Sequence, residues 1–261
     1  MIKFYDINKQ DKHLHNTFIR LLRKHFKKSD FILGQSVKNF EINFSNFTKS
    51  KFAVGCANGT DALYLALKVL NLPKNSEVIV PAMTWVSTVL AIVNNNLKPI
   101  LVDVNKDDCL ISLSEIKKNL SSKTKVILPV NLYGGVVNIK EIKNIIKNKK
   151  IFIIEDSAQA HGGKDNFGNN IGKHSDLSCY SFYPGKNLGC YGDGGMITTN
   201  KNKFYQKIIK LRNLGQKRKN IHDEIGVNSR LDSIQASLLN LKLKSLKKFN
   251  LKRKNISNFY K

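Results

Sequence analysis

Residues 52–154 alternate short apolar runs with helical patterns, and no other feature of the chain restricts its fold as strongly. Each apolar run has the length of a strand, and the segments between them carry apolar residues at helical spacing. This alternation predicts an α/β fold, in which helices flank a large, mainly parallel sheet. The predicted strands are Phe52–Val54, Val78–Val80, Pro99–Val102, Val126–Val130 and Ile151–Ile154, and the predicted helices are Gly59–Leu70, Ser87–Asn94, Leu113–Leu120 and Ile139–Lys147.

The segments on either side of this alternation are also structured. Helical spacing of apolar residues precedes it, and two short glycine-rich strands follow it before the helical pattern returns. These elements are helices over His13–Lys28, Ser36–Phe47, Lys203–Leu214 and Leu231–Leu246, and strands over Leu177–Phe182 and Gly195–Thr199.

The charge of the chain is unusual: 44 lysines and arginines face 19 acidic residues, for a formal net charge of +25. Nucleic-acid binding is one interpretation, because basic surfaces attract phosphate backbones. The lysines are nevertheless spread along the whole chain, with local density at Lys24–Lys28, Lys140–Lys150 and Lys242–Lys254. We therefore favour compositional drift and expect no nucleic-acid partner, although a basic exterior would help to steer an anionic substrate.

Nothing in the sequence indicates a membrane, a metal site or a disulfide framework. No apolar run approaches the roughly 18 residues that cross a bilayer, and the N-terminus lacks the apolar stretch of a secretory signal. Cys56, Cys109, Cys179 and Cys190 fit no metal-ligand spacing. Scattered thiols of this kind are typical of a cytoplasmic protein, which is our expectation for the location.

The first segment with chemical potential runs from Gly55 to Ala62, after a predicted strand and at the start of a predicted helix. A helix N-terminus can hold a phosphate with its free backbone N–H groups. Gly59 lets the backbone come close, and Thr60 adds a hydroxyl. The alternative is a simple helix cap by Asn58 or Thr60, which this segment alone would favour. The sequence is neither a P-loop nor a dinucleotide fingerprint.

Two further segments end predicted strands, at the edge where open parallel sheets bind ligands. Trp85, the only tryptophan, follows Val78–Val80 and could stack on a ring, although a core position is the alternative. Glu155 and Asp156 end the strand that begins at Ile151. Adjacent strand residues point to opposite faces, so only one of these acids can face a ligand, and a solvated acidic turn is the alternative.

The last segment, from Ser181 to Gly195, places Lys186 between a proline–glycine turn and a glycine-rich stretch. A lysine there, downstream of an acid at a strand end, is what pyridoxal-phosphate chemistry requires. The lysine can hold the cofactor as an imine, and the acid can keep the ring nitrogen protonated. Ser181 could bind a phosphate. A surface charge is the alternative for a single lysine among so many.

Taken together and in this order, these segments resemble the DegT/DnrJ/EryC1/StrS sugar aminotransferases, which are pyridoxal-phosphate enzymes of fold type I. The resemblance runs in family order from near the start of the chain to near its end. It is carried by Phe31–Gly34, Asn58–Leu63, Val80–Trp85, Glu155–Gly162, Ser181–Gly195 and Gly226–Ala236. It implies a pyridoxal-phosphate-binding α/β domain over residues 31–235, an N-terminal helical segment over 1–30, and the start of a smaller C-terminal domain over 236–261.

The resemblance implies a role for each matching position. The catalytic lysine is Lys186, and His161 is expected to touch substrate. The reach of Asn228 to the neighbouring subunit's cofactor implies a homodimer with shared sites. The residues expected to bind the cofactor are Gly59, Thr60, Trp85, Asp156, Gln159, Ser181, Lys186 and Asn228.

The implied reaction transfers an amino group, by resemblance from glutamate, to a keto group of a nucleotide-diphosphate sugar. The segments around Lys186 and Asn228 favour a 3-keto sugar, with a 4-keto sugar as the alternative. A related dehydratase branch replaces the lysine by histidine, so Lys186 argues against it. A regulatory homologue without turnover is a further alternative, because family members are longer and the chain stops at Lys261 within a helical pattern. Asn138 replaces the aspartate of many relatives at a predicted helix cap.

Overall fold

A seven-stranded sheet forms the centre of the computed structural model, which describes residues 6–147 and 149–260. The strand order is β1-β7-β6-β5-β4-β2-β3. Strand β7 pairs antiparallel with β1 and β6, and the other neighbouring pairs are parallel. The predicted mainly parallel sheet is therefore confirmed. Its strands are β1 (Phe52–Cys56), β2 (Glu77–Pro81), β3 (Lys98–Val102), β4 (Thr124–Ile127), β5 (Phe152–Asp156), β6 (Leu177–Ser181) and β7 (Gly195–Thr199).

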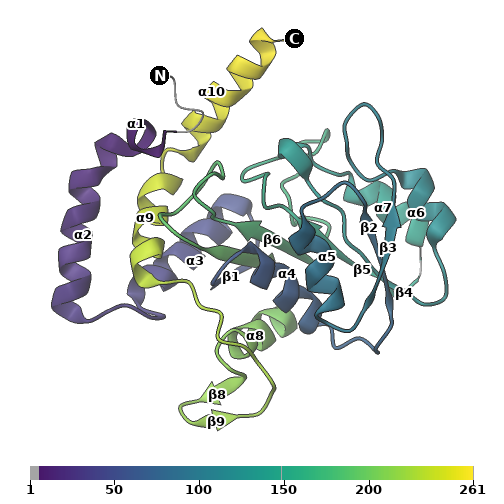
Figure 1. Cartoon of the computed structure of the whole chain (residues 1–261), viewed down its shortest axis with the longest axis horizontal. Helices are drawn as coiled ribbons and strands as arrows, with labels where there is room; N and C mark the ends of the chain where they lie inside the picture. Colours follow the sequence, from purple (N-terminus) through teal and green to yellow (C-terminus); the bar gives the residue numbers. More distant parts are fainter. Residues whose placement is uncertain (1–5, 148, 261) are drawn as a thin grey trace.

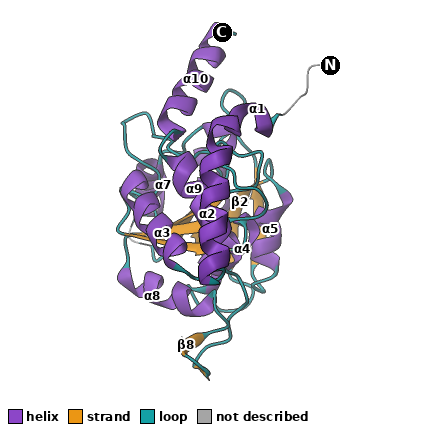
Figure 2. Cartoon of the chain, turned by 90° about the vertical axis from the view of Figure 1, so that its left-hand side faces the viewer, coloured by secondary structure: helices purple, strands orange, loops and turns teal. Residues whose placement is uncertain are grey.

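Helices cover both faces of this sheet, as Figure 2 shows. The alternation of side chains along β2 illustrates how they are held: Val78 and Val80 pack in one core, whereas Ile79 packs in another. The first core includes residues of α4 (Gly59–Lys68), α5 (Val86–Val93) and α8 (Asn202–Leu211). The second includes residues of α6 (Leu113–Asn119) and α7 (Ile139–Ile146). Asn138 caps α7 by accepting from the Lys140 N–H, as predicted.

A third core joins the sheet to α3 (Gln35–Thr48) and α9 (Ser233–Leu243). Its centre is aromatic: the Phe44 ring packs edge-on against Tyr180 and Phe182, with centroids 5.0 and 5.5 Å apart. Leu238 and Leu239 of α9 are buried in the same core. The first turns beyond residue 235 thus pack against the large sheet, and the division at that residue stays a prediction.

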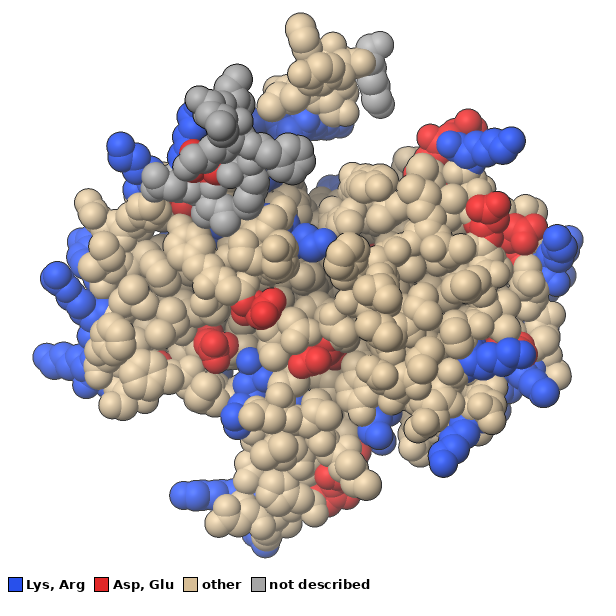
Figure 3. Space-filling view, viewed as in Figure 1, with Lys and Arg blue, Asp and Glu red and all other residues tan. Residues whose placement is uncertain are grey.

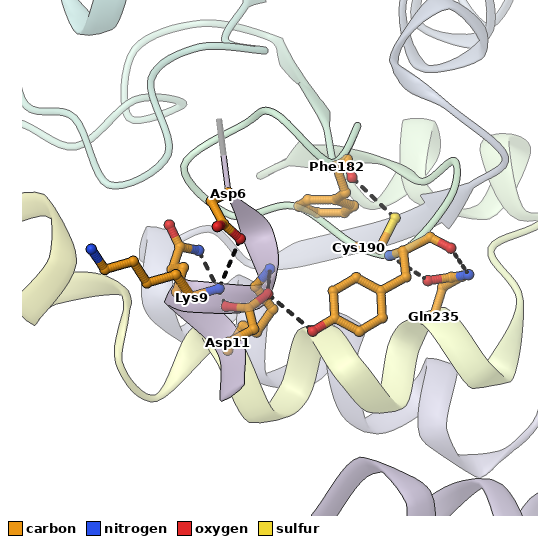
Figure 4. Close-up of polar contacts among 9 residues, drawn as sticks. Asp6, Lys9, Asp11, Phe182, Cys190 and Gln235 are labelled. Atoms are coloured by element: carbon orange, nitrogen blue, oxygen red, sulfur yellow. Dashed lines mark hydrogen bonds and ion pairs between the residues drawn. The ribbon is translucent and has the colours of Figure 1, made fainter. Parts of the chain in front are cut away.

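The N-terminal segment consists of α1 (Ile7–Asp11), a 3-10 turn (Lys12–Leu14) and α2 (His15–Lys28), where one helix from His13 was predicted. Buried Asp11 anchors it to the body. Its Oδ2 lies 2.8 Å from the Lys242 ammonium and accepts a 3.1 Å hydrogen bond from the Tyr191 hydroxyl. Figure 4 shows Asp11 beside the segment that carries Phe182 and Cys190, with Gln235 approaching from α9.

Two parts of the structure project from this body (Figure 1). The hairpin of β8 (Gln216–Arg218) and β9 (Ile221–His222) hangs below it and was not predicted. Helix α10 (Leu246–Phe259) extends from its upper side and continues the lysine-rich helical pattern. Within the described ranges, no helix is both long and apolar enough to span a bilayer.

The basic side chains are dispersed on the face that Figure 3 shows. Most lysines and arginines lie around the periphery of this face, and acidic groups lie both near its middle and at its upper right edge. For the described residues on this face, the high positive charge is therefore spread over many elements rather than gathered into one continuous track.

Candidate active site

A cavity of about 500 Å³ opens where the parallel strands end. Each wall comes from the segment that follows a strand, since β1, β2, β4, β5 and β6 all contribute the residues just beyond or at their carboxyl ends. This is the edge at which open α/β sheets bind ligands. The lining residues are Asn58, Gly59, Thr60, Leu63, Thr84, Trp85, Ser87, Val130, Asn131, Leu132, Asp156, Ala158, Gln159, Ser181, Tyr183, Lys186 and Asp193.

One wall is the N-terminus of α4. Asn58 caps this helix, because its side chain accepts a 2.8 Å hydrogen bond from the Asp61 N–H. Asn58 thus caps the helix, and the same helix N-terminus also lines the cavity, so the two alternatives for this segment are compatible. Gly59 is required by packing: a Cβ at this position would lie 2.6 Å from the Ser181 Cβ. The Thr60 hydroxyl donates to Ser87 at 2.8 Å. Backbone N–H groups and three hydroxyls therefore meet at one end of the cavity.

Asp156 is the acid that faces the cavity. It is 5% exposed, and burial raises the pKa of its carboxyl above the usual range. Hydrogen bonds from the Ala158 N–H (3.1 Å) and the Thr88 hydroxyl (2.8 Å) oppose this rise, as does the positive charge of Lys186. A buried carboxylate with these partners can bind a cationic N–H group placed in the cavity.

Glu155 lies on the opposite face of β5, as the alternation of strand side chains predicts. Its Oε1 accepts from the Gly172 N–H at 2.9 Å and from the Ser175 hydroxyl at 2.6 Å. Its Oε2 accepts from Asn131 at 3.1 Å. Glu155 therefore ties together the loops around β5 and does not line the cavity.

Lys186 enters the cavity from the loop that follows β6. Its backbone N–H donates to the Tyr183 carbonyl at 2.9 Å, which closes the predicted proline–glycine turn. Partial burial lowers the pKa of its ammonium group, and the charge of Asp156 opposes this effect. Lys186 and Asp156, the pair on which the interpretation of the sequence depends, thus line one cavity and influence each other's charge.

Trp85 and Gln159 also line the cavity. Trp85 is 72% exposed, so the alternative of a core tryptophan is wrong. Its ring is available to cover a planar ligand. Gln159 is held in place from behind, because its Oε1 accepts a 2.8 Å hydrogen bond from the Tyr133 N–H.

Two of the predicted residues lie outside this lining. His161 is fully buried, and its ring packs against Tyr180 and Phe182 with centroids 5.6 Å away in both cases. His161 therefore does not line the cavity, and its expected contact with substrate stays a prediction. Asn228 is exposed and its backbone bridges to Asn213. The expected contact of Asn228 with the cofactor of a neighbouring subunit therefore stays a prediction.

Other cavity residues were not singled out from the sequence. Tyr183 and Asp193 belong to the segment around Lys186, so their inclusion could have been inferred from that segment. Thr84, which lines the cavity, and its buried neighbour Thr88, which does not, were missed: their hydroxyls lie 2.7 Å apart, and Thr88 bonds Asp156. The available signal was a threonine pair at helical spacing around Trp85, just beyond a strand end.

These groups fit pyridoxal phosphate. A phosphate suits the α4 N-terminus with its hydroxyls and the close Gly59–Ser181 approach. Buried Asp156 could pair with a protonated ring nitrogen, and the Lys186 amine could react with an aldehyde. The volume of the cavity is sufficient for a ligand of this size. Among the described residues, no group of three or more metal-ligating side chains is gathered in space.

The model of the DegT/DnrJ/EryC1/StrS aminotransferase family matches residues 12–261. The chain is 36% identical to a pleiotropic regulatory protein of Geobacillus stearothermophilus, over 97% of this chain and 68% of that protein. It is also 36% identical to dTDP-3-amino-3,4,6-trideoxy-alpha-D-glucose transaminase of Streptomyces venezuelae, over 85% of this chain and 59% of that enzyme.

A solved structure is similar as well: DesV of S. venezuelae in complex with a ketimine intermediate, with a TM-score of 0.91 and 33% identity. The match covers 95% of this chain and 66% of that one. The chain thus spans between 59% and 68% of the length of these three relatives. The fold, the order of the motifs and the matched residues agree, and the chain belongs to the DegT/DnrJ/EryC1/StrS aminotransferase family.

Proposed function

We propose that this protein is a pyridoxal-phosphate-dependent aminotransferase acting on a nucleotide-diphosphate keto-sugar. The observation that carries the proposal is the placement of Lys186 and Asp156 in one cavity, with the α4 N-terminus beside them. A lysine whose pKa is lowered by burial is a better nucleophile and base at neutral pH than an exposed one.

Each residue has a defined task in this proposal. Lys186 would hold the cofactor through its aldehyde until the amino donor displaces it there, and its freed amine would then take the proton from the α-carbon of the donor and return it. Asp156 would keep the ring nitrogen protonated. Gly59, Thr60 and Ser181 would hold the phosphate, Trp85 would cover the ring, and Gln159 would lie near its hydroxyl. When bound, pyridoxal phosphate supplies an electron sink for the negative charge that develops at the reacting carbon.

The substrate class follows from the relatives. Five of them are named for a 3-amino sugar or a 3-keto sugar, including a UDP-N-acetyl-3-dehydro-alpha-D-glucosamine 3-aminotransferase that is 37% identical. A 3-keto sugar carried on a nucleotide is therefore the favoured acceptor, a 4-keto sugar is the alternative, and glutamate is the proposed donor. The dispersed positive charge would draw such anionic substrates toward the surface.

The proposal includes a homodimer with shared sites, and an apolar stripe supports it. Val86, Leu90 and Val93 recur along one face of α5, between 43% and 57% exposed, next to Trp85 at the cavity. Exposed apolar patches of this kind mark interaction surfaces. Asn228 lies three residues after Ile225, another apolar side chain that is strongly exposed, at 86%. A second copy that covers the α5 stripe could bring its Asn228 to the phosphate end of the cavity.

The direct test is to incubate the purified protein with pyridoxal phosphate, glutamate and a panel of nucleotide keto-sugars, and to detect amino-sugar by mass. We expect product with the native chain and none with Lys186→Ala, which should also lose the visible absorption of the lysine-bound cofactor. Full turnover by Lys186→Ala would refute the assignment.

A regulatory role without turnover is the second candidate, since one relative is named a pleiotropic regulatory protein. The same experiment separates the two. A protein that binds pyridoxal phosphate, shows no absorption change with glutamate and forms no amino-sugar would favour regulation.

A further inference from the structure

Lys186 lies near the tip of a loop that is closed at its base. The Cys190 N–H and thiol both donate to the Phe182 carbonyl, at 2.8 and 3.0 Å, and Figure 4 shows the second of these bonds. Leu188 is buried, but the Lys186 side chain itself is only partly covered. A long, flexible side chain reaches a fixed point only if the backbone beneath it is held.

The neighbouring residue supplies such a hold. The Asn187 side chain bonds His161 twice, through its Oδ1 with His161 Nδ1 at 2.7 Å and through its Nδ2 to the His161 carbonyl at 3.1 Å. The same Nδ2 donates to Asn250 Oδ1 of α10 at 3.0 Å. Asn250 in turn donates to the His161 carbonyl at 2.8 Å. Three residues from distant parts of the chain thus form a closed set of hydrogen bonds.

Each partner in this set is itself restrained. The His161 ring packs against Tyr180 and Phe182. Burial lowers its pKa to about 4, and the Asn187 hydrogen bond opposes this effect. The imidazole is therefore neutral near pH 7, and its Nδ1–H donates to Asn187 Oδ1 because an amide oxygen only accepts. A neutral donor on a rigid platform gives Asn187 one orientation.

We propose that Asn187 is the positioning residue for Lys186, and that α10 takes part in this positioning through Asn250. The proposal rests on the proposed function only for the task of Lys186, because the hold on the loop belongs to the chain alone. Asn187 fixes the backbone on one side of Lys186 and keeps the loop against the body. His161 acts behind it, as a support rather than as a substrate contact.

The test uses the protein without cofactor. Each lysine is labelled in competition with acetic anhydride across a range of pH, and the Lys186 peptide is quantified by mass spectrometry. In the native chain Lys186 should become reactive at a lower pH than exposed lysines, since partial burial lowers its pKa. In Asn187→Ala the loop should loosen, and the Lys186 profile should move to higher pH, toward the exposed lysines.

Two variants and a control sharpen the result. Asn250→Ala removes only the bonds from α10 and should move the profile in the same direction by less. Asn187→Leu is uncharged and similar in size to asparagine but makes none of these bonds, and it replaces Asn187→Ala if that variant does not fold. Asn95→Ala is the matched control, because Asn95 is also half-buried and its Nδ2 also donates twice, to the Tyr64 and Ala91 carbonyls, outside this set. Its profile should coincide with the native one.

A functional measurement complements the labelling. Misplacement of a reacting group by about 1 Å costs up to roughly a hundredfold, so Asn187→Ala should lower kcat about tenfold or more, with KM changed less. Unchanged Lys186 labelling in both Asn187 variants would overturn the proposal. The two proposals can fail separately. If the Lys186 labelling shifts as expected but neither the native chain nor any variant shows turnover, the proposed function fails and the positioning role of Asn187 stands.

Discussion

The Thr88 hydroxyl donates a 2.8 Å hydrogen bond to Oδ2 of Asp156, and both residues are buried. This bond opposes the rise in the pKa of Asp156 that burial causes. Thr88→Val should therefore raise the pKa of Asp156 further and weaken its hold on a cationic partner. Bonds to charged groups contribute about 1.5–3 kcal/mol, so kcat/KM should fall roughly ten- to a hundredfold.

The pH dependence identifies the cause of that loss. Asp156 must be ionised, so the acid limb of the pH–rate profile should move to higher pH in Thr88→Val. Thr88→Ser retains the hydroxyl and should keep a nearly native profile. An unshifted limb in Thr88→Val would show that Thr88 acts through packing alone.

Buried His161 should make the folded chain sensitive to acid. Burial lowers its pKa to about 4 from the usual histidine value of 6.5. The unfolded chain takes up this proton near pH 6.5, whereas the folded chain does not until about pH 4, so stability is lost as the pH falls through this window. The loss attributable to His161 is on the order of 3 kcal/mol.

Urea unfolding between pH 7 and pH 4 measures this effect, with His161→Asn for comparison. The variant should be less stable at pH 7 because it leaves a cavity, but its stability should fall less on acidification. Burial raises the pKa values of Asp156 and Glu155 and gives the opposite slope, but both proteins share that contribution. Parallel pH curves for the two proteins would contradict a neutral buried His161.

The buried pair of Asp11 and Lys242 should contribute strongly to stability only as a pair. Lys242→Met leaves a buried carboxylate with the Tyr191 hydroxyl as a donor, and loss of one partner typically costs about 3–5 kcal/mol. Adding Asp11→Leu should recover much of that loss. Lys210→Met breaks the exposed pair with Asp223 and should change the unfolding midpoint little. A small effect of Lys242→Met would argue against this anchor.

Shared sites can be tested by mixing two impaired variants. Lys186→Ala retains Asn228, and Asn228→Ala retains Lys186, so a mixed dimer contains one site with both residues intact. Refolding the two together should restore up to about one quarter of native activity if subunits pair at random. Val86→Lys/Leu90→Lys places charges on the α5 stripe and should give monomers by sedimentation. Absence of recovery in the mixture would mean that Asn228 does not serve a neighbouring site.

Much of the fold could be predicted because strand and helix periods differ strongly between residues 52 and 199. The strand ends also located Gly59, Trp85, Asp156 and Lys186 at one edge, because parallel strands share that edge. The local sequence pattern could not reveal the β8–β9 hairpin, because its strands have only three and two residues. It also could not show that His161 is buried, since a histidine beside a site has the same local sequence whether it is buried or reaches a ligand.

Hydrogen-bond partners that are far apart in the chain could not be predicted from the sequence, and the reason is physical. Asn187 and Asn250 meet only because α10 follows the turn after α9, and Thr88 meets Asp156 only across the sheet. Each bond joins residues that are far apart in the chain, and short polar side chains give no periodic signal of their partners.

The placement of β1 beside β7 has a consequence for biosynthesis. Among the described residues of the large sheet, β1 pairs only with β7, although residues 57–194 separate the two strands. During translation β1 cannot pair in the sheet until β7 has emerged from the ribosome. Until then Gly59 has no Ser181 beside it, so vitamin B6 should be captured only by nascent chains that have emerged beyond residue 199.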